Sequence, residues 1–395
     1  TALIQKKDAD DLDFSSVFYF NLAMCLVLYA GMFVAAPYIA KFYSDNSLVS
    51  VIRAISLTII ISGVKGIQQS YVSRNMLFKR FFFATLGGTI FSAFLGIGMA
   101  YAGCGVWSIV MQQLSNSAID TLILWITVKW RPKKVFSWER LKRLLSYGWK
   151  LLVSSILDTV YNNLRNLIIG KMYTSADLAY YNQGDKFPKV IVTNINASID
   201  SVLLPSMAGE QEHAERVKSM TRRAIKTSTY IMAPLMMGLL FCAEPIVKLL
   251  LTEKWLPCVP YLRIFCFTYM FWPIHTANLN AIKAMGRSDL FLSLEIIKKA
   301  MGLTLLMFTM RISVMAMAYS LIVSGILSQI INSWPNWKLL DYNYLEQLRD
   351  ILPSIIIATS MGICVYFIGS LPLPIIITLP IQIFAGAAIY ITASA

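Results

Sequence analysis

Ala35-Ala-Pro-Tyr-Ile-Ala40 is followed, 208 positions later, by a related stretch, Ala243-Glu-Pro-Ile-Val247. After each copy, a short acidic loop leads into a long apolar segment that carries an arginine and a polar cluster. Three polar residues recur at an offset of 210: Arg53 as Arg263, Lys65 as His275, and Gln68 as Asn278. Self-similarity at a long, fixed period indicates that the chain contains two copies of one multi-element unit.

The composition is that of a membrane protein. Hydrophobic residues make up 57% of the chain and charged residues 14%, against about 25% charged in an average soluble domain. About twelve segments reach or approach the roughly 20 residues that cross a bilayer. They lie near 14–40, 47–69, 81–103, 105–128, 144–170, 176–205, 227–251, 256–282, 289–310, 312–336, 346–369 and 371–393. The sequence therefore predicts an all-α polytopic membrane protein without a soluble domain.

Basic residues gather on one side of these spans. When the connections are numbered alternately, 21 of the 35 basic residues fall on one side and 4 on the other, namely Lys41, Lys171, Lys254 and Arg311. By the positive-inside rule the rich side is cytoplasmic, and the C-terminus lies there too. This distribution accounts for the net charge of +14 without nucleic acid as a partner. The ten remaining basic residues lie within spans.

The connection 129–143 is the strongest candidate boundary, because it is basic and Pro132 ends the helix before it. We expect an N-terminal lobe over 1–135, a C-terminal lobe over 136–340 and a peripheral helix pair over 341–395. The first copy lacks counterparts of 144–170 and 176–205. From the offset of the repeat, we expect about 60–70 residues before Thr1 and about fourteen spans in the intact protein.

Polar residues within the span 176–205 share one helix face. They follow one another at steps of three or four residues: Asn182, Lys186, Lys189, Thr193, Asn196 and Asp200. Such a face either seals against a neighbouring helix or lines a water-filled cavity. Two lysines in the hydrocarbon layer are costly unless they face protein or water, so the cavity wall is the favoured interpretation.

Other spans carry shorter polar sets. The span 144–170 holds Asp158 and Arg165 two turns apart, either as packing ion pairs or as substrate contacts. Asp120 lies at helical spacing from Gln112 and Asn116, where hydrogen bonds between helices are the favoured role. Lys65 and His275 are stronger candidates for the substrate cavity because they match one another in the repeat. Equivalent positions of two related halves converge on the central axis of many transporters.

The excess of buried cations predicts an anionic substrate. Lysine and arginine are natural partners of phosphate and pyrophosphate groups. The candidate cavity residues are Arg165, Lys186, Lys189, Asn182, Asn196, Lys65 and His275, and the candidates for ion pairs or ion coupling are Asp158, Asp200 and Asp120. The sequence contains no HExxH, P-loop or GxSxG motif. We therefore expect no enzyme activity, no cofactor and no metal, and transport driven by an ion gradient, by the membrane potential or downhill.

Several stretches resemble the polysaccharide transporter family, the O-antigen and teichuronic acid flippases of the MATE-like flippase superfamily. They are Ala2-Leu-Ile-Gln-Lys-Lys7, Gly105-Val-Trp-Ser108, Trp130-Arg-Pro132, Ile168-Ile-Gly-Lys171, Leu178-Ala-Tyr-Tyr-Asn182, and Ala243-Glu-Pro-Ile-Val-Lys-Leu-Leu-Leu251 with Trp255-Leu-Pro257. The last is the most specific, and together the stretches span almost the whole chain.

The resemblance implies two six-helix lobes in a V around a central cavity, plus two peripheral helices. It also implies a multi-pass protein of the bacterial cytoplasmic membrane. Its substrate would be an oligosaccharide linked to undecaprenyl pyrophosphate or a similar lipid, flipped to the outer leaflet by alternating access. The process served would be the biosynthesis of a surface polysaccharide. Candidate partners are a coupling cation (Na⁺ or H⁺) and a polysaccharide polymerase or glycosyltransferases. Related flippases place basic residues in the first helix of each lobe, where Arg165 is the match here.

Two other functions stay open. A cation-coupled multidrug antiporter shares the superfamily, and buried carboxylates such as Asp158 or Asp200 would then carry the coupling. A membrane glycan polymerase or ligase is a third candidate, but such enzymes tend to carry a large outer loop. Every connection on the side poor in basic residues is short, which weighs against that function.

Overall fold

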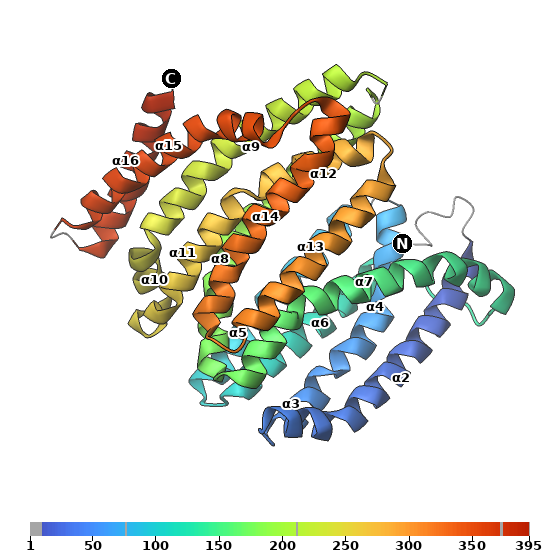
Figure 1. The fold of residues 1–395 in the computed structure, drawn as a ribbon. Coiled ribbons are helices and arrows are strands. Elements are labelled where there is room, and N and C mark those ends of the chain that lie inside the picture. Colours follow the sequence, from blue (N-terminus) through green and yellow to red (C-terminus); the bar gives the residue numbers. More distant parts are fainter. Residues whose placement is uncertain (1–9, 76, 211, 372–373, 395) are drawn as a thin grey trace. The chain divides into compact units, whose positions relative to one another are not determined.

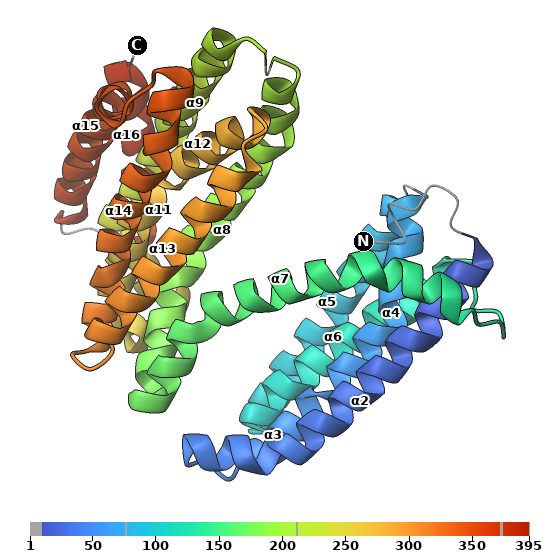
Figure 2. The same ribbon diagram turned by 45° about the vertical axis from the view of Figure 1, so that its right-hand side comes forward.

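Helices make up nearly all of this computed structural model, which describes residues 10–75, 77–210, 212–371 and 374–394 (Figure 1). No strand occurs within these ranges. The described contacts divide the chain into two compact units, Thr1–Asn162 and Asn163–Ala395. This division falls inside one continuous helix, α7 (Trp138–Met172), which runs unbroken in Figure 2. The lobe limits expected from the sequence stay predictions.

The first unit is a set of helices that pack against their neighbours along the chain. They are α2 (Asp11–Tyr43), α3 (Leu48–Ile55), α4 (Leu57–Arg74), α5 (Phe78–Tyr101) and α6 (Val106–Thr127). Helix α4 packs against both α2 and α6, and α5 lies along α6. Gly105 has a φ of 55°, a conformation that favours glycine, at the turn that starts α6.

The start of α2 is fixed by a reciprocal cap. The Asp10 side chain accepts from the Asp13 backbone N–H, and the Asp13 side chain accepts from that of Asp10. Arg140 Nη1 donates to Asp10 Oδ2 at 2.6 Å, which ties the first turn of α7 to the same point. The backbone hydrogen bond from Asp13 and the contact with Arg140 lower the pKa of Asp10 to about 2.

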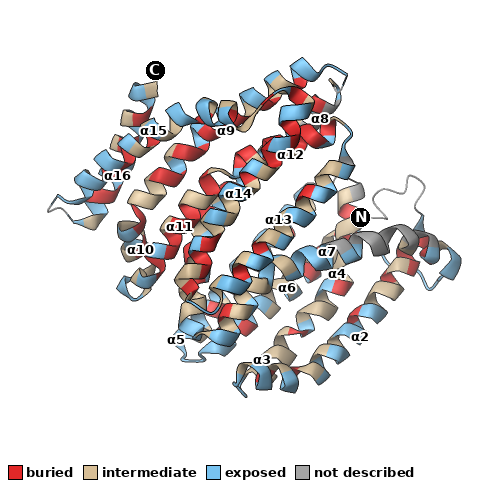
Figure 3. Ribbon diagram, in the orientation of Figure 1, coloured by how far each residue is buried: buried red, intermediate tan, exposed pale blue. Residues whose placement is uncertain are grey.

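The second unit holds the remaining helices. They are α8 (Ser175–Ala208), α9 (Ala214–Phe241), α10 (Ala243–Leu251), the 3₁₀ helix η1 (Glu253–Cys258), α11 (Val259–Met270), α12 (Trp272–Ala284), α13 (Ser288–Thr309), α14 (Val314–Leu340), α15 (Tyr344–Gly369) and α16 (Ile375–Ser394). Most side chains of α11 and α12 are buried, because these helices pack against α8, α9 and α14 (Figure 3).

Each span predicted from the sequence overlaps at least one described helix, and two residues of the predicted span 371–393 lie outside the described residues. Seven helical segments of the described chain are long and apolar enough to cross a membrane: Asp11–Tyr43, Leu48–Ser73, Lys79–Tyr101, Ala214–Phe241, Val314–Leu340, Tyr344–Gly369 and Ile375–Ser394. The other predicted spans carry the polar faces of α6, α7, α8 and α13, or are divided between two helices. The predicted span 256–282, for example, is divided between α11 and α12. Pro273, near the start of α12, has no backbone N–H to continue the hydrogen bonds of a preceding helix.

Equivalent residues of the repeat make equivalent contacts in the two units. Arg53 Nε donates to the carbonyl of Phe33 at 3.3 Å, and Arg263 Nε donates to that of Leu240 at 3.4 Å. Gln68 is buried and donates to the carbonyl of Trp130, just after α6. Its counterpart, Asn278, is buried against residues at the end of α14 and the start of α15. At these positions, residues that match in the sequence repeat also make similar contacts in the structure.

Candidate substrate-binding groups within the two units

The polar face of α8 divides into two parts along the helix. Asn182, Lys186, Lys189 and Thr193 are exposed within the second unit. Further along, Asn196 is buried and accepts from Thr276 Oγ1 of α12 at 3.3 Å. Asp200, although exposed, accepts from Asn280 Nδ2 of α12 at 2.7 Å. The first part presents exposed polar groups that make no hydrogen bond or ion pair with another helix within the described chain, and the second part holds α8 against α12.

The two lysines of this face have different surroundings. Lys189 Nζ lies 3.2 Å from Asp185 Oδ2, one helical turn earlier. Lys186 makes no ion pair or hydrogen bond within the described chain. The side chain of Lys189 is 59% exposed, so its attraction to Asp185 is screened by solvent and contributes little stability. Lys186 is thus the less compensated cation of the two.

Asp185 is the centre of a contact that the sequence did not assign to the site. It accepts a hydrogen bond from the Tyr269 hydroxyl of α11 in addition to its pairing with Lys189. The two helices approach closely here, since a Cβ at Gly184 would lie 2.7 Å from Tyr261 Cβ and 2.8 Å from the Leu262 backbone nitrogen. The spacing of Asp185 and Lys189 was a usable signal in the sequence. No sequence pattern pointed to Tyr269, because it lies on another helix.

Arg165 reaches the same region from α7. Its Nη2 donates to Ser320 Oγ of α14 at 3.3 Å, while its buried Nη1 has no hydrogen-bond partner among the described residues. The guanidinium also lies within electrostatic reach of Tyr181 and Tyr269. Arg165, Asp185 and Lys189 therefore belong to one polar region of the second unit, with Lys186 beside it on α8.

The remaining candidates lie in other places. Lys65 of α4 forms an ion pair with Asp120 of α6, inside the first unit. His275 Nδ1 lies 3.0 Å from Asn332 Nδ2 of α14, inside the second unit. Asp158 is exposed on α7, in the part that belongs to the first unit. The structure thus unites two residues, Lys65 and Asp120, that the sequence had placed in separate groups.

These two pairs occupy equivalent positions of the repeat. Lys65 matches His275 at an offset of 210, and Asp120 lies 212 positions before Asn332. In the first unit the contact is a partly buried ion pair, in which the side chain of Lys65 is 20% exposed and that of Asp120 is 7% exposed. In the second unit it joins a histidine to a neutral amide. The same place in the repeat therefore holds an ion pair in the first unit and a histidine–amide hydrogen bond in the second.

A buried amide network closes the end of α12 against α14 and α15. Asn278 Nδ2 donates to Gln347 Oε1 at 2.8 Å, and Asn336 Nδ2 donates to Asn278 Oδ1 at 2.7 Å. Ser333 Oγ donates to Gln347 Oε1 at 3.0 Å. All four residues are buried, and hydrogen bonds within such a network satisfy polar groups that would be costly alone. This network holds the three helices together, and Asn336 Oδ1 is the atom of it that has no hydrogen-bond partner among the described residues.

No group of three or more metal-ligating side chains occurs within the described part of the chain. The arrangement offers cations, hydroxyls and amides. Groups of this kind bind a polar or anionic ligand by hydrogen bonds and charge.

A two-unit, all-α protein with several membrane spans and polar groups placed inside them belongs to the class of multi-pass membrane proteins. A family model described as "Polysaccharide biosynthesis protein" matches residues 1–260. The chain therefore belongs to that family, and the resemblance seen in the sequence is confirmed.

Curated relatives cover most of the chain. Teichuronic acid biosynthesis protein TuaB of Bacillus subtilis (strain 168) is 24% identical over 99% of this chain and 82% of its own length. Lipopolysaccharide biosynthesis protein WzxC of Escherichia coli (strain K12) is 22% identical over 92% of this chain and 76% of its own. Succinoglycan biosynthesis transport protein ExoT of Rhizobium meliloti (strain 1021) is 22% identical over 68% of this chain.

A solved structure shares the fold. Lipid II flippase MurJ, in an inward closed conformation, superposes with a TM-score of 0.80, covering 99% of this chain and 84% of its own, at 15% identity. At that identity the likeness concerns the fold alone. The predicted all-α polytopic membrane fold is confirmed, and the protein is a multi-pass bacterial membrane protein.

Proposed function

We propose that this protein moves a lipid-linked oligosaccharide across the cytoplasmic membrane for the biosynthesis of a surface polysaccharide. The observation that carries this proposal is the match of nearly the whole chain to a lipid flippase fold within a polysaccharide biosynthesis family. The names of the relatives, in teichuronic acid and lipopolysaccharide biosynthesis, support the same substrate class. In this proposal the protein is a transporter and does not catalyse a covalent reaction.

The lipid carrier in this proposal is undecaprenyl pyrophosphate. The polar region of the second unit supports an anionic group: it combines Arg165, Lys186 and Lys189 with one carboxylate, Asp185, for a formal charge of +2. A pyrophosphate diester carries two negative charges and complements this region. The unpartnered Nη1 of Arg165 and the free ammonium of Lys186 would contact its oxygens. Asn182, exposed on the same face of α8, would contact the sugar.

The motion proposed is alternating access by movement of one unit against the other. The division of the chain into two compact units supports it, because each unit has its own buried core. The orientation proposed places the basic connections and the C-terminus in the cytoplasm. A coupling cation and a polymerase or glycosyltransferase partner also belong to this proposal. Lys65, His275, Asn196 and the carboxylates Asp120, Asp158 and Asp200 would act in packing or coupling rather than in primary contact with the anion.

Charge removal on α8 and α7 tests the substrate assignment. We expect Lys186→Ala, and more strongly Arg165→Gln with Lys186→Ala, to reduce surface polysaccharide at least about tenfold, which corresponds to a loss of roughly 1.4 kcal/mol. Lys186→Arg should retain most of the activity because it keeps the charge. Surface polysaccharide in cells is measured beside the amount of protein in the membrane.

Lys254→Ala is the matched control, since it removes an exposed lysine of η1 outside the polar region. Normal polysaccharide in the Arg165→Gln, Lys186→Ala double variant would refute the anion assignment. Drug resistance conferred on a sensitive host and lost with Asp158→Asn or Asp200→Asn would favour an antiporter instead.

A further inference from the structure

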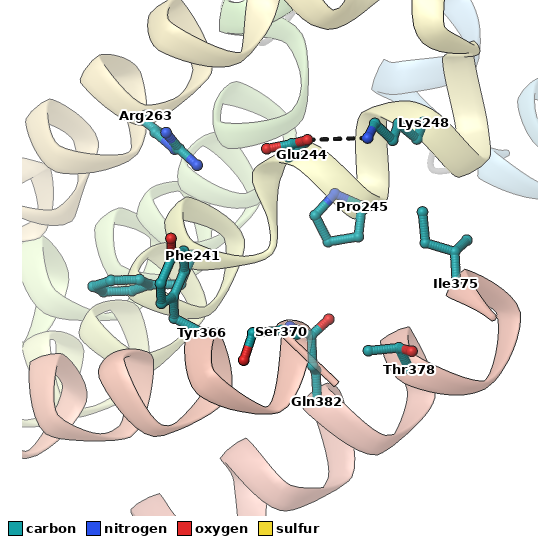
Figure 4. Close-up of a pocket in the computed structure, with 11 residues that line it drawn as sticks. Phe241, Glu244, Pro245, Lys248, Arg263, Tyr366, Ser370, Ile375, Thr378 and Gln382 are labelled. Carbon is teal, nitrogen blue, oxygen red and sulfur yellow. Dashed lines mark ion pairs between the residues drawn. The ribbon is translucent and has the colours of Figure 1, made fainter. Parts of the chain in front are cut away.

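A pocket of about 270 Å³ lies at one end of the second unit, between α10 and α11 on one side and α15 and α16 on the other (Figure 4). Its lining includes six polar or charged side chains: Glu244, Lys248, Arg263, Ser370, Thr378 and Gln382. Pockets for drug-sized ligands start near 300 Å³. This one suits a small polar group, and it is distinct from the polar region around Arg165.

Two cations of the pocket have capacity for an anion. Arg263 donates through Nε to the Leu240 carbonyl, and it makes no other hydrogen bond or ion pair within the described chain. Its terminal nitrogens are therefore available. Lys248 lies 3.1 Å from Glu244 one turn earlier, a pair whose side chains are 32% and 52% exposed. Because exposed pairs of this kind are weak, Lys248 can turn to a stronger anion.

Gln382 supplies a second, independent sign of a ligand. The residue is 2% exposed, and its Nε2 donates to the Val365 carbonyl at 2.9 Å. That bond fixes the orientation of the amide, because the opposite flip would set two oxygens against each other. Oε1 is left buried without a hydrogen-bond partner among the described residues. Figure 4 shows this oxygen directed into the space beside Pro245. An unsatisfied buried acceptor is costly, and here it calls for a donor from a bound group.

The pocket lies near the ends of the candidate spans Tyr344–Gly369 and Ile375–Ser394, because Ser370 and Ile375 line it. Gln382 is seven residues after the start of α16, about 10 Å along a helix axis. Beyond it α16 continues as an apolar span, with Ile383 and Phe384 exposed along its side. A ligand with a polar head and apolar tails would place its head in the pocket and its tails against that surface.

We propose that this pocket binds the headgroup of a membrane phospholipid that carries both a phosphate and an ammonium group, as phosphatidylethanolamine does. The phosphate contacts Arg263 and Lys248, and the ammonium donates to Gln382 Oε1 and Glu244. The pocket is on the side poor in basic connections, so the lipid belongs to the outer leaflet. The proposal needs a membrane-embedded chain but does not depend on which substrate is transported.

Native mass spectrometry on the full chain, purified and delipidated in detergent, tests this site. Phosphatidylethanolamine is added beside phosphatidylcholine, whose methylated nitrogen has no N–H to donate. We expect phosphatidylethanolamine to bind about tenfold more tightly, and Arg263→Gln and Gln382→Leu each to abolish that preference. Arg53→Gln is the matched control, because Arg53 is the repeat equivalent of Arg263 in the first unit. It should leave the preference unchanged.

Equal binding of the two lipids to the unaltered protein would overturn the proposal, and so would an unchanged preference in Arg263→Gln. Inorganic phosphate and soluble phosphoethanolamine are tested as competitors. Displacement of the lipid by inorganic phosphate at equal concentration would assign the pocket to a free anion and would also overturn it. Loss of polysaccharide transport has no bearing on these outcomes, since lipid binding is measured without substrate.

Discussion

At the scale of single residues, the clearest difference between the two units lies at one pair of equivalent positions of the repeat. The Lys65–Asp120 ion pair and the His275–Asn332 hydrogen bond hold equivalent helices together. A charge in a poorly hydrated interior is tolerated because its partner compensates it. Removing one partner of a neutral pair leaves a smaller penalty. The first unit should therefore be more sensitive to substitution at this position than the second.

Asp120→Ala should lower the free energy of unfolding by about 3 kcal/mol, because it leaves Lys65 without a counter-charge in a mostly buried place. Lys65→Met combined with Asp120→Leu should recover much of this loss. Asn332→Ala is the matched control, with an expected loss of about 1 kcal/mol. Thermal unfolding of the purified variants in one detergent gives the ranking. Equal losses for Asp120→Ala and Asn332→Ala would contradict the argument.

At the scale of elements, the close approach of α8 and α11 at Gly184 determines where the polar region lies. The hydrogen bond from Tyr269 to Asp185 joins these same two helices. Any side chain at position 184 would press on the backbone of α11, which cannot give way as a flexible side chain can. The glycine thus acts on the candidate site through helix packing and does not itself contact a ligand.

Gly184→Ala should destabilise the second unit by about 1–3 kcal/mol, the usual cost of overpacking a core. Gly98→Ala is the control, because a Cβ there meets nothing within 4 Å and alanine favours the helix. The two variants are compared by thermal unfolding and by cell-surface polysaccharide. A Gly184→Ala variant as stable as the Gly98→Ala variant would show that α8 and α11 are not packed as described.

The elements themselves were largely predictable, whereas their partners were not. Long apolar runs located the spans, and the offset of 210 identified Arg53 and Arg263 as equivalent before their matching contacts were known. Helical periodicity places Lys189 and Asp185 on one face. It carries no information about which other helix that face meets. For that reason Tyr269 and Asn332 escaped notice, and Lys65 and Asp120 were not recognised as a pair.

At the scale of the whole molecule, the distribution of basic residues predicts which ends of the helices face the cytoplasm. Cys104 offers a natural probe of this orientation. It is exposed in the turn between α5 and α6, at the end poor in basic residues. The connection 129–143 lies at the opposite end of α6 and is exposed at Lys134. A cysteine at either place reports the side of the membrane on which it lies.

We expect a membrane-impermeant maleimide to label Cys104 in intact cells, in a variant whose other five cysteines are replaced by serine or alanine. Lys134→Cys, introduced into a background that also lacks Cys104, should react only after the membrane is opened. The expectation follows from the positive-inside rule. The reverse pattern of labelling would invert the topology and move the phospholipid pocket to the cytoplasmic leaflet.

Helix α7 has no interruption where the two units divide, at Asn162 and Asn163. Its backbone hydrogen bonds link each turn to the next, so the segment resists twisting far more than a loop would. A rotation of one half of α7 about the helix axis is therefore transmitted to its other half. Because each half of α7 belongs to a different unit, a movement of one unit against the other requires α7 to bend near Asn162 and Asn163, or its halves to shift at the connections 128–137 and 173–174. The rate of such a rearrangement should therefore depend on how easily α7 bends at the point where the two units meet in the sequence.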